Sequence, residues 1–135
     1  MGSDQVVDRM GFTSNQLILE VGHRDDCDQE LRNSIKNRVG SDFIENTANE
    51  VVDAVIIWWR DEDGDLVDEL VDALTFLTED GPIWVLTPKV GRPGHVEASD
   101  IQDAAPTAGL SQTVSFPAGS NWTATKLVHR KGSKK

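Results

Sequence analysis

Cysteine is nearly absent from this chain of 135 residues, and the chain has no long hydrophobic run. The single cysteine, Cys27, has no second cysteine with which to form an internal disulfide. No apolar stretch approaches the roughly 20 residues that a membrane-spanning helix needs. The N-terminus also lacks the basic and apolar regions of a secretory signal. We therefore expect a cytoplasmic protein, and its length fits one domain.

Positive charge is also scarce. The chain has 13 Lys and Arg against 23 Asp and Glu, which gives a net charge of −10. This balance disfavours nucleic acids and anionic membranes as partners. The cations are unevenly placed, because residues 82–135 hold 7 Lys and Arg against 3 acids. We expect this basic third to lie beside the acidic remainder, which neutralises part of its charge.

Three short apolar segments, 16–21, 51–59 and 83–87, predict strands that are buried on both faces, as in a parallel sheet. Helices are predicted after Asp25 or Asp26, after 61–65, and from Ser99. Segments 110–116 and 121–129 are joined by a short turn, which predicts an antiparallel hairpin. The fold class is therefore α/β: a Rossmann-like three-layer sandwich over residues 17–130. Residues 1–16 are interpreted as a short helix or an arm, and 131–135 as a basic tail.

Cations follow the predicted parallel strands at the points where they end. In sheets of this class, ligands bind beyond the carboxyl ends of the strands, where the winding reverses. A carboxylate or phosphate is the ligand that such cations would bind. Alternatively, Lys89 and Arg92 pair with Asp61, Asp63 or Glu97. The candidate ligand-binding edge consists of Gly22, His23, Arg24, Arg60, Lys89 and Arg92, with Trp122 either covering it or packing in the core.

Three other patterns have simpler structural interpretations. Residues 61–65, DEDGD, lack the spacing of a calcium loop and are better explained as the start of a helix. Acidic neighbours around Cys27 disfavour a reactive thiolate and favour core packing. The three histidines are too scattered for a metal site, and no nucleophile motif is present. Trp58 and Trp59 are expected on opposite faces of the sheet.

Three segments together resemble an actinobacterial family, domain of unknown function 3052. They are VVDAVIIWWRDEDGDLVDELVDAL, IWVLTPKVGRPGHVEASDIQDAAPTAGL and NWTATKLV, and the resemblance covers about Gly11 to Arg130. The strand order also resembles a shortened class I methyltransferase sheet. That second resemblance implies a glycine-rich turn for S-adenosylmethionine, but the turn here reads EVGHRDD, with Gly22 alone. Glu45 stands where such enzymes place a ribose-binding carboxylate.

These observations favour a non-catalytic module that acts through a protein partner or a small anionic ligand. No cofactor, metal or catalytic residue is expected, and the oligomeric state is left open. The alternative is a degenerate methyltransferase-like enzyme that binds S-adenosylmethionine. A weaker third hypothesis is association with nucleic acid through the loop cations and the tail HRKGSKK.

Overall fold

The computed structural model describes residues 2–44, 51–119 and 121–129. Helices and strands alternate along most of the chain. In order they are α1 (Gly2–Met10), β1 (Ile18–Val21), α2 (Gln29–Val39), β2 (Ala54–Trp58), α3 (Leu66–Leu74), β3 (Ile83–Pro88), α4 (Ala98–Thr107), β4 (Leu110–Pro117) and β5 (Trp122–His129).

The five strands form one sheet in the order β1-β2-β3-β5-β4. β1, β2 and β3 are parallel neighbours, and all five residues of β2 and all six of β3 are buried. β5 runs antiparallel to both β3 and β4. The predicted fold class, with central parallel strands and a C-terminal antiparallel hairpin, is therefore confirmed.

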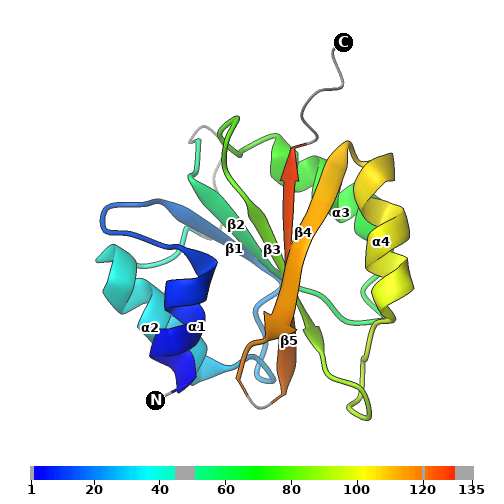
Figure 1. The fold of residues 1–135 in the computed structure, drawn as a ribbon, viewed down its shortest axis with the longest axis horizontal. Coiled ribbons are helices and arrows are strands. Elements are labelled where there is room, and N and C mark those ends of the chain that lie inside the picture. The colour runs from blue at the N-terminus through cyan, green and yellow to red at the C-terminus, as the bar shows by residue number, and fades with distance from the viewer. Residues whose placement is uncertain (1, 45–50, 120, 130–135) are drawn as a thin grey trace.

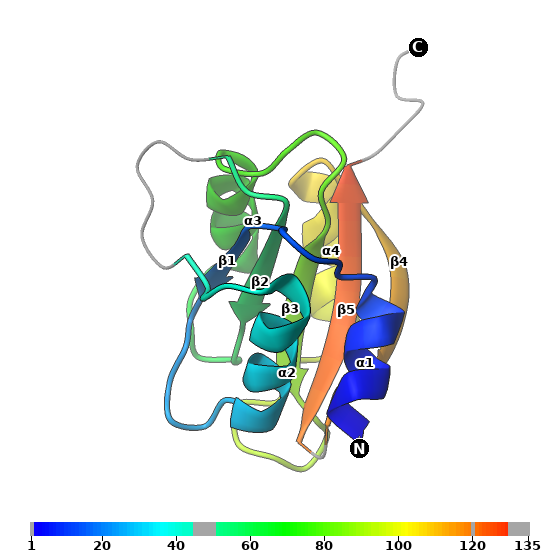
Figure 2. The ribbon, with the colours of Figure 1, turned by 90° about the vertical axis from the view of Figure 1, so that its left-hand side faces the viewer.

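Helices cover both faces of this sheet, which gives three layers (Figures 1 and 2). α1 and α2 pack on one face, and α3 and α4 on the other. Trp58 and Trp84 belong to the core on the α1–α2 side, whereas Trp59 belongs to the core under α3 and α4. The prediction that Trp58 and Trp59 point to opposite faces is confirmed, because successive side chains of a strand alternate between its faces.

The N-terminal segment is helical and packs on its own domain. Val6, Val7 and Met10 on α1, together with Phe12 after it, are buried in the same core as α2. Burial of an apolar side chain of this size contributes about 1.5–3 kcal/mol. Of the two interpretations left open by the sequence, the helix is the one observed.

Several local predictions were wrong in detail. Asp28 caps α2, not Asp25 or Asp26, and its carboxylate accepts a hydrogen bond from the Leu31 backbone N–H at 3.0 Å. α4 begins at Ala98, so Ser99 lies inside the helix and does not cap it. By contrast, Asp65 does cap α3, as the helix-start interpretation of 61–65 predicted.

Two segments are described only in part or not at all. Residues 41–45 do not form a full strand: Ile44 makes a single parallel bridge to Leu19. Glu45 and the tail 131–135 lie outside the described residues. In the part of the chain that is described, no helix has both the length and the apolar character that crossing a membrane requires.

Candidate functional site

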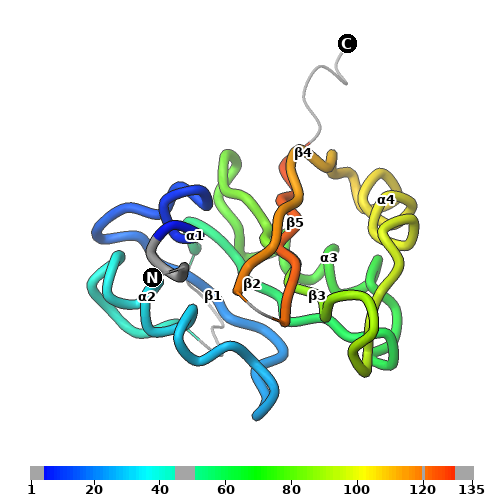
Figure 3. Tube along the Cα trace, turned by 60° about the horizontal axis from the view of Figure 1, so that its bottom comes forward, coloured from blue at the N-terminus to red at the C-terminus, as the bar shows by residue number. Residues whose placement is uncertain are grey.

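The turns that leave β1, β2 and β3 meet at one end of the sheet, which Figure 3 turns toward the viewer. An Arg60 Nη donates a hydrogen bond to the carbonyl oxygen of Gly22 at 2.8 Å, which joins the first turn to the second. The Asp61 N–H donates to the carbonyl oxygen of Gly94 at 2.9 Å, which joins the second to the third. The predicted convergence of these turns is confirmed.

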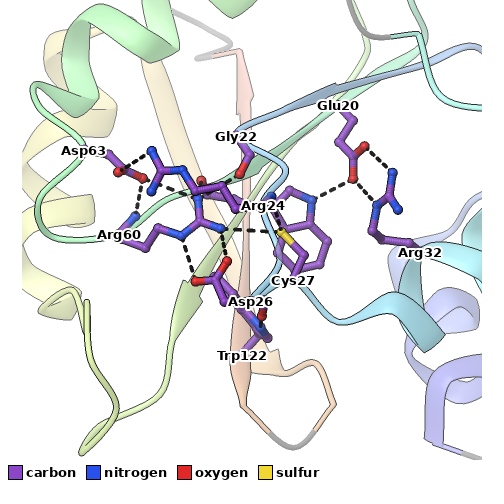
Figure 4. A network of polar contacts seen from close by, with 10 residues as sticks. Glu20, Gly22, Arg24, Asp26, Cys27, Arg32, Arg60, Asp63 and Trp122 are labelled. Atoms are coloured by element: carbon purple, nitrogen blue, oxygen red, sulfur yellow. Dashed lines mark hydrogen bonds and ion pairs between the residues drawn. The ribbon is translucent and has the colours of Figure 1, made fainter.

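Arg60 is the centre of this edge (Figure 4). Only 3% of its side chain is exposed. Its Nε donates to Asp26 at 3.0 Å, and its Nη atoms reach the other Asp26 oxygen and the Trp58 carbonyl oxygen, the latter at 3.0 Å. Asp63 lies 3.5 Å away and also pairs with Arg24 at 2.9 Å. The guanidinium therefore has most of its donors engaged by the chain itself.

Glycine allows these turns to approach so closely. Gly22 has a positive φ of 83°, and a Cβ at this position would overlap the carbonyl oxygen of Trp58. A Cβ on Gly94 would lie 3.0 Å from the Cβ of Arg60. Because these two glycines lack side chains, the Trp58 backbone and the aliphatic part of Arg60 pack directly against them. The space beside each glycine is therefore filled by the protein itself.

The ion pair between Arg60 and Asp26 shifts both pKa values. The hydrogen bonds from Arg60 lower the pKa of Asp26 despite an opposing effect of burial. Burial works against the charge of Arg60, but its bonds to Asp26 outweigh this and raise its pKa. Burial raises the pKa of the nearby Cys27 thiol, so this cysteine is held in its unreactive form.

Trp122 and Lys89 attach the β4–β5 hairpin to this edge. The Trp122 ring packs edge-on against Trp58 with centroids 4.9 Å apart, and its indole N–H donates to the Asp26 carbonyl oxygen at 3.2 Å. The Arg60 guanidinium lies 5.4 Å from the Trp122 ring centroid, in cation–π range. The Lys89 ammonium donates to the Gly119 carbonyl oxygen at 3.0 Å. Of the two interpretations of Trp122, core packing is the one observed: it is 2% exposed and belongs to the core under α1 and α2.

The two other predicted residues are available to solvent. His23 and Arg92 are exposed, and neither side chain forms a hydrogen bond or ion pair within the described residues. The edge is therefore less basic than the sequence suggested, because Arg60 and Arg24 are paired with acids. The alternative partners predicted for Lys89 were wrong, since it binds a backbone carbonyl instead.

A second buried ion pair lies nearby and was not predicted from the sequence. Glu20 in β1 accepts hydrogen bonds from the Arg32 guanidinium, one of them at 2.7 Å, and from the Trp58 indole N–H at 2.9 Å. The available signal was a carboxylate at an otherwise apolar strand position and an arginine beside the apolar stripe of α2. This network ties α2 to β1 and β2 on the face opposite α3.

A hollow of about 590 Å³ lies beside Arg60 and has both acidic and basic walls. It is lined by Arg24, Asp25, Asp26, Arg60, Glu62, Pro93 and Gly94. In the described ranges, no group of three His, Cys, Asp or Glu side chains is arranged to hold a metal ion. Hydrogen bonding to a polar ligand is the chemistry that this hollow offers.

A family model described as "Protein of unknown function (DUF3052)" matches residues 7–131. The chain belongs to this family. The uncharacterized protein Rv2239c of Mycobacterium tuberculosis is 49% identical over 123 residues, which cover 91% of this chain and 77% of that protein. The resemblance inferred from the three sequence segments is therefore confirmed, and the mycobacterial relative agrees with an actinobacterial family.

Solved methyltransferases share the fold. The mitomycin 7-O-methyltransferase MmcR matches with a TM-score of 0.62 at 14% identity, over 96% of this chain and 53% of MmcR. The pyocyanin biosynthetic protein PhzM matches with a TM-score of 0.70 at 10% identity, over 96% of this chain and 55% of PhzM. The chain thus spans about half the length of both proteins, and at such low identity the likeness shows the fold alone.

The turn after β1 departs from the glycine-rich turn that the methyltransferase resemblance implies for S-adenosylmethionine. Positions 23–26 carry side chains where closer backbone approach requires glycine, and Asp26 crosses to Arg60 over the carboxyl ends of β1 and β2. Asp28 also takes the Leu31 N–H at the start of α2. At this turn, the Asp26 and Asp28 carboxylates are therefore already bonded to other groups of the chain.

Proposed function

We propose that this domain is a non-catalytic recognition module that binds a partner protein or a small anionic ligand at the carboxyl edge of its sheet. The observation that carries the proposal is the engagement of Arg60 by Asp26, Gly22 and Trp58. A buried cation with its donors satisfied holds the turns in place and has little capacity left for a substrate. A cytoplasmic location is part of the same proposal.

The exposed part of this edge supplies the recognition surface. Arg92 and His23 are exposed, and Val90 near the start of the β3–α4 loop is 82% exposed. An exposed apolar side chain beside a free guanidinium suits a partner that presents a carboxylate next to an apolar group. Lys89 contributes indirectly, because its bond to Gly119 fixes the base of this loop.

The test compares two variants that change the net charge equally. Arg92→Gln removes one positive charge from the edge, and Asn37→Asp adds one negative charge at an exposed position near the end of α2. Tagged forms of each are used to recover partners from the native host. We expect Arg92→Gln to lose a partner that both the unaltered chain and Asn37→Asp retain. Identical recovery by all three would contradict the proposed edge.

A degenerate methyltransferase-like enzyme is the second candidate, and the shared fold favours it. Thermal unfolding with about 1 mM S-adenosylhomocysteine separates the two, because a ligand at 100 times its Kd stabilises a protein by about 2.7 kcal/mol. We expect no change in Tm. A rise of several degrees would favour the enzyme, and calorimetric titration with S-adenosylmethionine would then give the affinity.

A further inference from the structure

The outer edge of β4 is open. β4 pairs with β5 on one side, and nothing in the described part of the chain pairs with its other side. Figure 1 shows β4 nearest the viewer, with no ribbon in front of it. Gln112, Thr113, Val114 and Ser115 are exposed, and 45% of Val114 is accessible to solvent. An edge strand of this kind presents unpaired backbone N–H and C=O groups.

This edge carries no charge. Residues 104–125 contain no Asp, Glu, Lys or Arg, whereas a stretch of that length at the chain's average of 27% would hold about six. Soluble proteins commonly place charged residues on exposed edge strands, because charge prevents pairing with another sheet. Here that protection is missing in a chain that is otherwise rich in charge.

A groove between α4 and β4 extends the uncharged surface. It has a volume of about 440 Å³, and its six lining residues are all uncharged: Gln102, Ala105, Pro106, Leu110, Ser111 and Gln112. The groove lies alongside the first half of β4. Side chains of an added strand could therefore be accommodated on the α4 side of the edge, which is the arrangement that strand addition uses.

We propose that β4 pairs antiparallel with β4 of a second copy, which joins two five-stranded sheets across a two-fold axis. A two-fold interface brings the same patch of each copy together. The patch must therefore be complementary to itself in charge and shape. Two copies with a net charge of −10 repel each other over most of their surfaces. The uncharged edge is where this repulsion is weakest, and the exposed Val114 adds apolar surface that pairing would remove from water.

The pairing is limited at two points of β4. The register with β5 shifts between Gln112 and Val114, which marks a bulge at Thr113 and a local bend of the strand. Pro117 has no N–H to donate, so it ends the ladder. The proposed pairing therefore uses residues 111–115. It does not depend on the proposed function, since neither Arg92 nor Arg60 takes part in it.

Sedimentation equilibrium of the whole chain from about 1 to 200 µM tests the pairing. Val114→Lys places a charge on the edge, and Val71→Lys makes the same change on α3, where Val71 is 48% exposed. We expect the unaltered chain to dimerise in this range, Val114→Lys to weaken dimerisation by about tenfold or more, and Val71→Lys to leave it within about twofold. Thermal unfolding of each variant checks that it is folded.

Hydrogen exchange locates the interface. Those backbone amides of 111–115 that point away from β5 should gain protection as the concentration of the unaltered chain rises, because pairing with a second copy bonds them. A monomer at about 200 µM, or a dimer that Val114→Lys and Val71→Lys weaken equally, would overturn the proposal. Protection gained on another surface, with β4 unchanged, would do the same.

Discussion

Replacing Arg60 should destabilise the protein strongly, because its buried guanidinium serves several partners at once. Arg60→Met keeps much of the side-chain volume and removes the charge and all donors. The carbonyl oxygens of Gly22 and Trp58 then lose their side-chain donor. The Trp58 carbonyl is buried and the Gly22 carbonyl partly buried, and each acceptor left unpaired in this way costs about 1–2 kcal/mol.

The ion pair with Asp26 adds less than its geometry suggests. The Asp26 side chain is 47% exposed, so water screens it and competes for it. A discounted value of about 1 kcal/mol is appropriate for such a pair. The total expected loss for Arg60→Met is therefore about 3–5 kcal/mol, which is the range found when one partner of a buried pair is removed.

Urea unfolding followed by tryptophan fluorescence at pH 7 measures this loss. Arg38→Met is the matched control: Arg38 pairs with Asp8, but the two side chains are 33% and 66% exposed. We expect the control to cost at most about 1 kcal/mol. A loss below about 1 kcal/mol for Arg60→Met, or one equal to the control, would refute the structural role assigned to Arg60.

A double-mutant cycle with Asp26→Asn separates the ion pair from the carbonyl contacts, with an expected coupling energy of about 1 kcal/mol at pH 7. The coupling energy should fall as the pH is lowered, because protonation of Asp26 removes its charge. The pKa of folded Asp26 lies below its ordinary value of 3.8. The stabilisation is therefore fully present above pH 3.8 and is lost as the pH falls through the lower, folded pKa.

Gly22→Ala should cost about 2–4 kcal/mol of unfolding free energy, because positive φ strain adds to overlap with the Trp58 carbonyl oxygen. Gly91→Ala, at a φ of 89° in open space, should cost only about 1 kcal/mol, and equal losses would contradict the close approach. Burial, with Asp72 and Asp63, raises the pKa of Glu69, so its charge opposes folding above that pKa. Glu69→Gln should therefore raise Tm at pH 7, with the difference vanishing below the unfolded pKa; a constant difference at all pH values would exclude this cause. Cys27 in the native protein should react with iodoacetamide at pH 7.5 about tenfold more slowly than in urea, and equal rates would contradict its burial.

Much of the fold could be predicted from local pattern. The segments that became β2 and β3 are apolar on both faces, and only a sheet covered on both sides buries such strands completely. The short turn before Trp122 required the last two strands to be antiparallel. These facts predicted that Gly22, Arg60 and Lys89 lie at one edge, because the carboxyl ends of parallel strands lie on the same side of a sheet.

The sequence alone determined most of the helices and strands, since these depend on residues close together in the chain. It also indicated the edge that their turns share, because strands apolar on both faces favour a parallel sheet. Only the tertiary structure decided what the side chains at that edge do. Arg60 meets Asp26 across 34 positions, and Trp122 meets Asp26 across 96. The sequence shows that a cation is present but not whether a distant acid pairs with it. That pairing depends on how the whole sheet brings its turns together.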